Sequence, residues 1–180
     1  MGSILHGLYL SHELLVRHRE WHYVNGITIA SVCERGDPIG KERDLQTISP
    51  VVLIVDDDPD SREMYSLALS FLGFRPCAVS NAEDAFARAC DMHPDAVVAD
   101  VTLPGASGLD LTRRLRADIR TKDAGIIILS GHASAAAEQR ASDAGCDRYL
   151  VKPFLPDALA LEIHDVLNSR HQAQLRERQL

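Results

Sequence analysis

Two aliphatic runs without polar alternation constrain the fold of this chain more than any other feature. They are Val-Val-Leu-Ile-Val at 51–55 and Ile-Ile-Ile-Leu at 126–129. A strand that is apolar on both faces needs cover on both sides, and helices supply that cover in parallel sheets. The sequence therefore predicts a parallel sheet enclosed between two layers of helices.

Three further segments complete a set of five expected strands, at 75–79, 96–99 and 148–151. A stretch with helical signals follows each strand, so the chain alternates between five strands and five helices. This alternation predicts right-handed crossovers and a doubly wound α/β fold. We expect the flavodoxin-like strand order 2-1-3-4-5 for the sheet.

Capping residues indicate where the helices begin and end. Asp58 followed by Pro59 predicts the start of the first helix, and Gly73 predicts its end. Ser80 and Glu83 have the spacing of a capping box for the second helix. The other helices are expected at about 108–118, at about 133–144 before Gly145, and from Pro156 onward.

Helical spacing also predicts the apolar faces of the first and third helices. The first helix has its apolar set at Met64, Leu67, Ala68, Phe71 and Leu72. The third has Leu109, Leu111, Leu115 and Ile119, with Arg113, Arg114 and Arg116 on its exposed face. An apolar stripe opposite a charged face is typical of a helix that packs on a core.

The chain divides into three parts. Residues 50–168 hold the five strands and helices and form the expected domain. Residues 1–49 are an N-terminal extension of unknown role, partly disordered or helical. We expect a helix there at 8–24, a short strand at 27–32 and a polar linker at Arg35–Gln46. Residues 169–180 are expected to be a polar C-terminal tail.

Charge and composition exclude several classes of partner. The formal net charge is −7, and residues 50–168 hold 19 acidic and 11 basic side chains. Because phosphate contacts need a basic face, we expect no nucleic-acid partner. The N-terminal region lacks a secretory signal pattern and no apolar run has the length of a membrane span, so we expect a cytoplasmic protein without a membrane partner. The four cysteines form no C-x-x-C pair, which favours reduced thiols.

Side chains that can do chemistry stand at the ends of four strands. Asp56 and Asp57 follow the first strand, Asp100 the third, Ser130 the fourth and Lys152 the fifth. Because the carboxyl ends of the strands meet at one crevice, these side chains should lie together. Three carboxylates in a small space repel one another, and a hard cation such as Mg²⁺ relieves that repulsion. The sequence therefore predicts a magnesium site.

The same set of side chains suits a phosphoryl group. Lys152 offers a positive point charge for phosphoryl oxygens, and Ser130 offers a hydroxyl donor. A carboxylate nucleophile can form an aspartyl phosphate, in a reaction that depends mainly on positioning and charge stabilisation. Asp100 is the expected nucleophile because it stands alone on the central strand, opposite Asp56 and Asp57.

Four motifs at these strand ends resemble the receiver domains of bacterial two-component response regulators. They are VVLIVDDDPDSR at the first strand, VVADVTLPGASGLDL around Asp100, IIILSGHA around Ser130 and YLVKPF around Lys152. The spacing agrees as well, with 43 positions from Asp57 to Asp100, 30 more to Ser130 and 22 more to Lys152. The resemblance covers about 51–168, roughly two-thirds of the chain.

The resemblance implies a role for each residue at the site. Asp57 and Asp100 would bind Mg²⁺ directly, together with the backbone carbonyl of Thr102, while Asp56 would act through a water molecule. Lys152 would pair with the phosphoryl oxygens. The peptide bond between Lys152 and Pro153 would be cis.

Further residues would connect the site to a partner surface. Ser130 and Tyr149 resemble the switch pair that turns toward the phosphoryl group. Thr102 and His132 lie two positions after Asp100 and Ser130, where family members tune the phosphoryl lifetime. The fourth helix, the fifth strand and the fifth helix would form the face that binds a downstream protein target.

The resemblance implies a signalling protein that accepts its phosphoryl group from a sensor histidine kinase or a histidine phosphotransfer protein. Such a protein is no enzyme beyond its own phosphorylation and dephosphorylation. Because 169–180 is too short for an output domain, we expect a stand-alone, single-domain regulator. One alternative is a receiver-like interaction module that does not signal. The other is a Mg²⁺-dependent aspartyl-phosphate hydrolase, although Asp60 departs from the DxDx[TV] signature of such enzymes.

Overall fold

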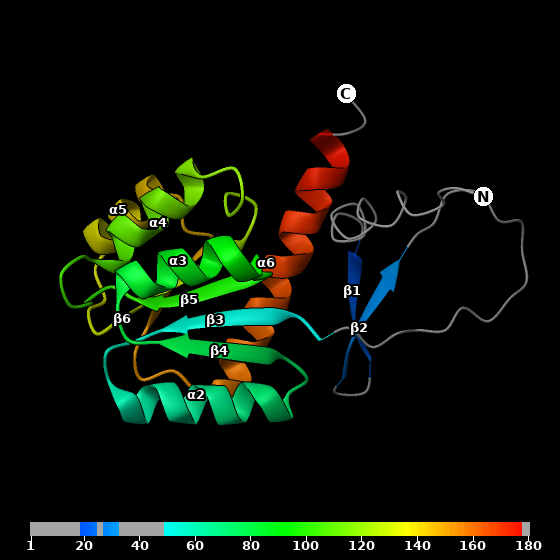
Figure 1. Cartoon of the computed structure of the whole chain (residues 1–180), viewed down its shortest axis with the longest axis horizontal. Coiled ribbons are helices and arrows are strands. Elements are labelled where there is room, and N and C mark those ends of the chain that lie inside the picture. Colours follow the sequence, from blue (N-terminus) through cyan, green and yellow to red (C-terminus); the bar gives the residue numbers. More distant parts are fainter. Residues whose placement is uncertain (1–18, 25–26, 33–48, 178–180) are drawn as a thin grey trace, which may run out of the picture.

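The computed structural model describes residues 19–24, 27–32 and 49–177. Its main body is a sheet of five parallel strands: β3 (Val51–Val55), β4 (Arg75–Val79), β5 (Ala96–Asp100), β6 (Gly125–Ser130) and β7 (Arg148–Val151). The strands lie in the order β4-β3-β5-β6-β7, which confirms the predicted order (Figure 1). The edge strands are β4, which contains Pro76, and β7, which has four residues.

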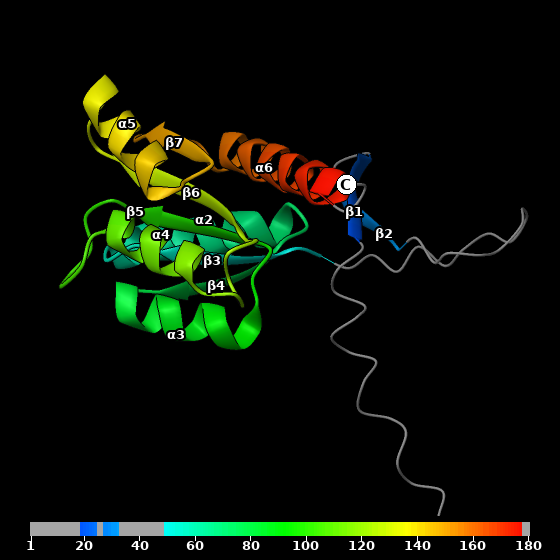
Figure 2. The ribbon, with the colours of Figure 1, turned by 90° about the horizontal axis from the view of Figure 1, so that it is seen from above.

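A helix follows each of these strands, as the alternation predicted. The helices are α2 (Pro59–Phe71), α3 (Ala82–Met92), α4 (Gly108–Ala117), α5 (Ala135–Ala144) and α6 (Pro156–Glu177). One face of the sheet packs against α2 and α6, and the other packs against α3 and α4. Figure 2 shows α5 beside β7. This arrangement is the predicted doubly wound α/β fold.

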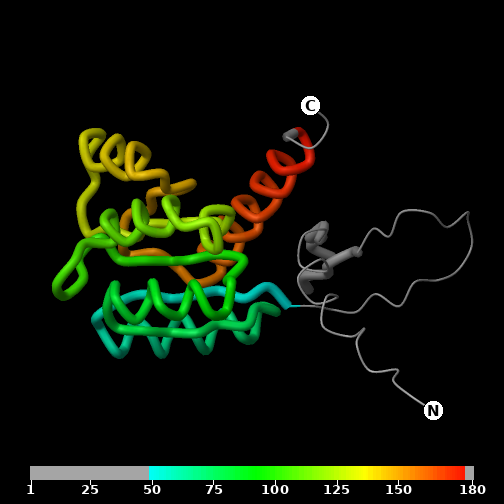
Figure 3. The backbone as a smooth tube through the Cα atoms, turned by 45° about the horizontal axis from the view of Figure 1, so that its top comes forward, coloured from blue at the N-terminus to red at the C-terminus, as the bar shows by residue number. Residues whose placement is uncertain are grey.

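The helix α6 is longer than the sequence pattern suggested. It continues to Glu177, so the expected boundary between domain and tail at 168–169 falls inside the helix. Figure 3 shows its last turns extending beyond the sheet. Within the described residues, no helix combines the length and the apolar character that a membrane span requires.

The N-terminal extension contains a strand where a helix was expected. Arg19–Val24 forms β1, so the helix predicted over 8–24 is wrong for these residues. The strand predicted at 27–32 is confirmed as β2 (Ile27–Val32), which pairs with β1 in antiparallel register. β1 lies against α6. Residues 8–18 and the linker predicted at Arg35–Gln46 lie outside the described residues.

Local capping explains where the helices begin. Asp58 caps α2 ahead of Pro59, as predicted, and accepts a hydrogen bond from the first turn at 2.9 Å. The capping box expected at Ser80 is wrong by one residue, because Asn81 caps α3 and accepts a hydrogen bond from the backbone of Asp84 at 2.9 Å. Asparagine satisfies a free N–H at a helix start as well as serine does.

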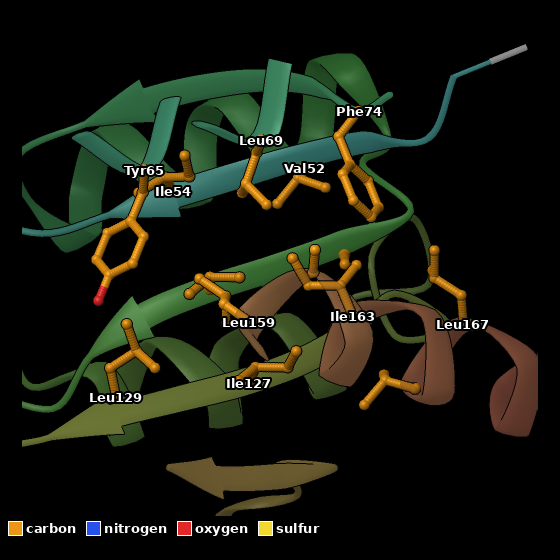
Figure 4. Close-up of a cluster of buried hydrophobic side chains, with 14 residues drawn as sticks. Val52, Ile54, Tyr65, Leu69, Phe74, Ile127, Leu129, Leu159, Ile163 and Leu167 are labelled. Atoms are coloured by element: carbon orange, nitrogen blue, oxygen red, sulfur yellow. The ribbon is translucent and has the colours of Figure 1, made fainter. Parts of the chain in front are cut away.

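Two clusters of buried side chains form the core, one on each face of the sheet. The cluster against α2 and α6 includes Val52, Ile54, Val98, Ile127, Leu129, Tyr65, Leu69, Leu159 and Ile163 (Figure 4). The cluster against α3 and α4 includes Leu53, Val55, Val97, Ile126, Ile128, Ala85, Ala89, Leu111 and Leu115. Successive residues of β3 and β6 enter opposite clusters, which explains why these strands show no polar alternation.

The apolar stripe expected on α2 faces the core only in part, because Leu72 packs against the core cluster but most of the other large members do not. Met64, Leu67 and Phe71 are 45%, 59% and 81% exposed, whereas Tyr65 and Leu69 are buried. The helix has apolar residues on more than one side, and its rotation about its own axis decides which of them are covered. Periodicity alone does not determine that rotation.

Two residues near the end of α4 also differ from expectation. Ile119 is 74% exposed because α4 ends at Ala117, after which helical spacing no longer sets its direction. Arg116, expected on the exposed face, instead donates hydrogen bonds to the Gly145 carbonyl at 2.8 Å and to two carbonyls ahead of β6. A Cβ at Gly145, whose φ is 97°, would lie 3.0 Å from the Arg116 side chain. Glycine therefore ends α5 and leaves room for the arginine.

Candidate functional site

Three carboxylates meet at the carboxyl ends of β3 and β5. Asp56 and Asp57 directly follow β3, and Asp100 is the last residue of β5. Carboxylate oxygens of the three residues lie within 4.8 Å of one another. β3 and β5 are neighbours in the sheet, so their parallel register brings both ends to the same edge. The structure thus brings the predicted acidic residues together.

The loop after β3 holds its two carboxylates in different surroundings. Asp56 is 2% exposed and accepts hydrogen bonds from the Asp58 backbone at 3.0 Å and from the Lys152 ammonium at 2.8 Å. Arg62 on α2 donates to the backbone carbonyl of Asp56 at 2.7 Å, which fixes the peptide between Asp56 and Asp57. The Asp57 side chain is exposed and open to an incoming cation.

Asp100 is held by its neighbours at both carboxylate oxygens. Its Oδ1 accepts a hydrogen bond from the Thr102 backbone at 2.8 Å, and its Oδ2 contacts the Lys152 ammonium. Gly108, the first residue of α4, packs directly on the same strand end. A Cβ at Gly108 would lie 2.1 Å from the Asp100 carbonyl oxygen, so any larger residue would displace the helix or the strand. Sequence reasoning found neither this role of Gly108 nor the contact of Arg62.

Lys152 is the cation that binds two of the three carboxylates. Burial favours its neutral form, but hydrogen bonds to Asp100 and Asp56 outweigh this effect and raise the pKa of Lys152. The side chain therefore stays positively charged. One ammonium among three carboxylates leaves negative charge in excess, which a divalent cation can neutralise. The bond from Lys152 to Pro153 is cis, as predicted.

Ser130 and Tyr149 both reach the backbone of His132. The buried Ser130 hydroxyl accepts a hydrogen bond from the His132 N–H at 3.2 Å, and the Tyr149 hydroxyl donates to the His132 carbonyl at 2.7 Å. The His132 side chain is exposed. A cavity of about 140 Å³ lies beside these three residues. The predicted switch pair thus shares one segment of the loop between β6 and α5.

The donor set at the site fits Mg²⁺. This ion prefers oxygen ligands and is usually held by one or two carboxylates, with the remaining positions filled by other oxygens. Asp57 and Asp100 supply carboxylates that approach each other closely, and Asp56 lies beside them. A ligand role for the Thr102 carbonyl remains a prediction from the resemblance.

Residues 52–164 match the family model of the response regulator receiver domain. This chain belongs to the response regulator receiver family. The receiver is 36% identical over 120 residues to the phosphate regulon transcriptional regulatory protein PhoB of Pseudomonas aeruginosa. The matched region covers 67% of this chain and 52% of PhoB. It is also 31% identical over 119 residues to the DNA-binding response regulator MtrA of Mycolicibacterium smegmatis. That matched region covers 66% of this chain and 51% of MtrA. The chain therefore spans about half the length of these relatives.

The receiver is also similar to solved structures along nearly their whole length. The chemotaxis response regulator CheY4 of Vibrio cholerae has a TM-score of 0.63 and is 28% identical. The similarity covers 66% of this chain and 99% of CheY4. The part of this chain that matches is thus a whole receiver domain.

Proposed function

We propose that this receiver accepts a phosphoryl group on Asp100 and thereby changes its affinity for a protein partner. The observation that carries the proposal is the position of Asp100. Its carboxylate contacts the Lys152 ammonium and lies within 4.8 Å of the carboxylates of Asp56 and Asp57. A nucleophile between a fixed cation and a metal-binding pair suits phosphoryl transfer, in which positioning and charge stabilisation do most of the work.

The transfer would move a phosphoryl group from a phosphohistidine of the donor to Asp100. An oxygen of the Asp100 carboxylate attacks phosphorus while the bond between phosphorus and the imidazole nitrogen breaks, and the leaving imidazole takes a proton from water. The Lys152 ammonium neutralises charge on the phosphoryl oxygens. The Thr102 backbone N–H fixes the orientation of the carboxylate. Mg²⁺, held by Asp57 and Asp100 with Asp56 nearby, would supply further positive charge to the phosphoryl oxygens.

The switch would begin at Ser130. A phosphoryl group on Asp100 offers its hydroxyl a charged acceptor, which is a stronger partner than the neutral His132 backbone. Tyr149 shares that backbone segment, so a shift of the loop would also move the tyrosine. The population of two conformers would then change on the face formed by α5, β7 and α6, where we place the partner. Thr102 and His132 are proposed to tune the phosphoryl lifetime.

The proposed phosphoryl donor is a sensor histidine kinase or a histidine phosphotransfer protein. The proposed readout is binding of a downstream protein in the cytoplasm, in a phosphorelay. The stand-alone organisation expected from the sequence stays a prediction, because the related proteins PhoB and MtrA are about twice as long as the region they share with this chain.

The test is the intact mass of the protein after incubation with acetyl phosphate and Mg²⁺. We expect a gain of one phosphoryl group in the natural chain and in the matched control Asp91→Asn, an exposed position on α3. We expect no gain in Asp100→Asn or with a chelator. An Asp100→Asn protein that gains the group at the natural rate would refute the assignment.

The two alternative functions give different results in the same experiment. Binding of Mg²⁺ without any phosphoryl gain from acetyl phosphate or a histidine donor would favour a non-signalling interaction module. Repeated turnover of phosphate monoesters would favour the hydrolase.

A further inference from the structure

We infer that Tyr65 is a positioning residue for Lys152 and acts through the loop that joins β7 to α6. The inference rests on the proposed function, because it concerns how the cation beside Asp100 is held. It adds a residue of α2 that does not itself contact the carboxylates.

Tyr65 joins two segments that are distant in the sequence. Its ring is buried, 3% exposed, in the cluster between the sheet and α2. Its hydroxyl points toward the carboxyl ends of the strands (Figure 4) and donates a hydrogen bond to the backbone carbonyl of Phe154 at 3.0 Å. The two residues are 89 positions apart. The phenol therefore ties the middle of α2 to the loop that carries Lys152.

The loop has anchors on both sides of this contact. At its start the Lys152 N–H donates to the Ser130 carbonyl at 2.8 Å, and at its end the Leu159 N–H donates to the Leu155 carbonyl at 2.9 Å. Phe154 lies between these anchors, and its ring packs on the same cluster as Tyr65. The hydroxyl thus fixes the direction of the backbone two residues after Lys152.

The hydroxyl is a dependable donor at physiological pH. Burial raises the pKa of Tyr65, while the charge of Lys152 lowers it and the charges of Asp56 and Asp100 raise it. The phenol therefore keeps its proton.

A small movement of this loop matters because Lys152 must satisfy two carboxylates at once. Its ammonium bonds Asp56 at 2.8 Å and also contacts Asp100. A displacement of about 1 Å can slow a positioned reaction by up to about a hundredfold. A hydroxyl that restrains the backbone beside Lys152 therefore acts on the reaction without contacting the phosphoryl group.

The experiment compares Tyr65→Phe with the matched control Ser70→Ala in the full chain. Tyr65→Phe keeps the ring and removes only the hydroxyl. Ser70 also lies on α2 and also donates to a backbone carbonyl, that of Ser66 at 2.8 Å, but it is exposed. Two quantities are measured, the hydrogen exchange rate of the Lys152 amide and the rate of phosphoryl gain from acetyl phosphate.

For Tyr65→Phe we expect the Lys152 amide to exchange about fivefold faster and the phosphoryl gain to be about fivefold slower, the size of one lost hydrogen bond. In a Lys152→Ala background Tyr65→Phe should have no further effect on the phosphoryl gain. Ser70→Ala should leave both rates at their natural values.

Unchanged amide exchange in Tyr65→Phe would overturn the inference. So would an equal slowing of phosphoryl gain with and without Lys152, because the tyrosine would then act by another route. If the natural chain gains no phosphoryl group from acetyl phosphate or from a histidine donor, the proposed function fails, while the amide exchange still decides whether Tyr65 holds the loop.

Discussion

The two ends of the sheet both gather charged side chains, but they balance these charges in opposite ways. At the carboxyl end, three carboxylates lie close together, and the Lys152 ammonium binds two of them, those of Asp56 and Asp100. At the amino end, the single carboxylate of Asp147, just before β7, binds the guanidinium groups of Arg116 and Arg170. The first cluster has an excess of negative charge, and the second has an excess of positive charge.

The amino-end cluster is fully satisfied by the protein itself. Asp147 accepts hydrogen bonds from Arg116 at 2.9 Å, from Arg170 at 2.8 Å and from the Ile126 backbone at 2.7 Å. Arg116 also binds three backbone carbonyls. Burial, followed by the charge of Arg170, lowers the pKa of Arg116 to about 10, so it still carries its charge at neutral pH. The cluster joins α4, β6, β7 and α6.

The two clusters differ in whether the protein itself compensates the charges that it brings together. Parallel strands bring loops together at both ends of the sheet, so geometry alone does not distinguish a structural cluster from a binding site. Both carboxylate oxygens of Asp147 are bound by protein donors, whereas the Asp57 side chain at the carboxyl end is exposed and open to a cation. The same kind of substitution should therefore have opposite consequences at the two ends.

The largest effect is expected for Asp147→Asn. Removing the carboxylate leaves two largely buried guanidinium groups without their counter-charge, which should lower the free energy of unfolding by roughly 2–4 kcal/mol. Urea unfolding measures this loss, with Asp143→Asn on the exposed face of α5 as the control. The affinity for Mg²⁺ should be unchanged under native conditions. A loss below about 1 kcal/mol would contradict a structural role for the cluster.

A smaller change is expected for Asp57→Asn, in the free energy of Mg²⁺ binding instead of the free energy of unfolding. Loss of a ligand should weaken Mg²⁺ binding by at least about tenfold, or ~1.4 kcal/mol. The free energy of unfolding without metal should stay the same or rise, because one source of repulsion is removed. Calorimetric titration with Mg²⁺ and urea unfolding provide the two measurements. A clear loss of stability would show that both ends of the sheet serve the fold.

The smallest effect concerns His164, which is buried on α6 with its ring centroid 4.8 Å from that of Phe74. Burial lowers the pKa of His164, against the opposing charge of Asp165. The neutral His164 side chain therefore contributes its full stability above its pKa in the unfolded chain, about 6.5. This contribution is lost as the pH falls through the lower pKa of His164 in the folded protein. The urea midpoint should fall less between about pH 7.5 and about pH 5.5 in His164→Gln than in the natural chain. An equal fall of the urea midpoint in both proteins would show that another group causes the acid sensitivity.

Much of the carboxyl-end site was predictable from the sequence. A parallel sheet brings strand ends together, so Asp56, Asp57, Asp100 and Lys152 could be grouped by their positions after the strands. The contacts that support them were not predictable. By its sequence Tyr65 is one more apolar residue of a helix, and only the packing of α2 on the sheet brings its hydroxyl to Phe154, 89 positions later.

The wrong prediction for Arg116, at the amino end of the sheet, has a similar cause. Arg116 looks like a surface residue by helical spacing, and it gains its partners only where the loop after α5 and the segment ahead of β6 approach it. The error at β1 was avoidable, because the sequence at 25–26 is Asn-Gly between two β-prone runs, a strong signal for a hairpin. Local signals were sufficient there, whereas Arg116 and Tyr65 required the tertiary arrangement.

The two edge strands of the sheet have a consequence for the behaviour of the protein in solution. An open edge can pair with the edge of another molecule and start aggregation. On β4, Pro76 has no N–H to offer such a partner, and β7 is only four residues long and carries the exposed charge of Arg148. Replacement of these features by ordinary β-forming residues would make the sheet extendable. The edge strands themselves thus discourage growth of the sheet from one molecule to the next.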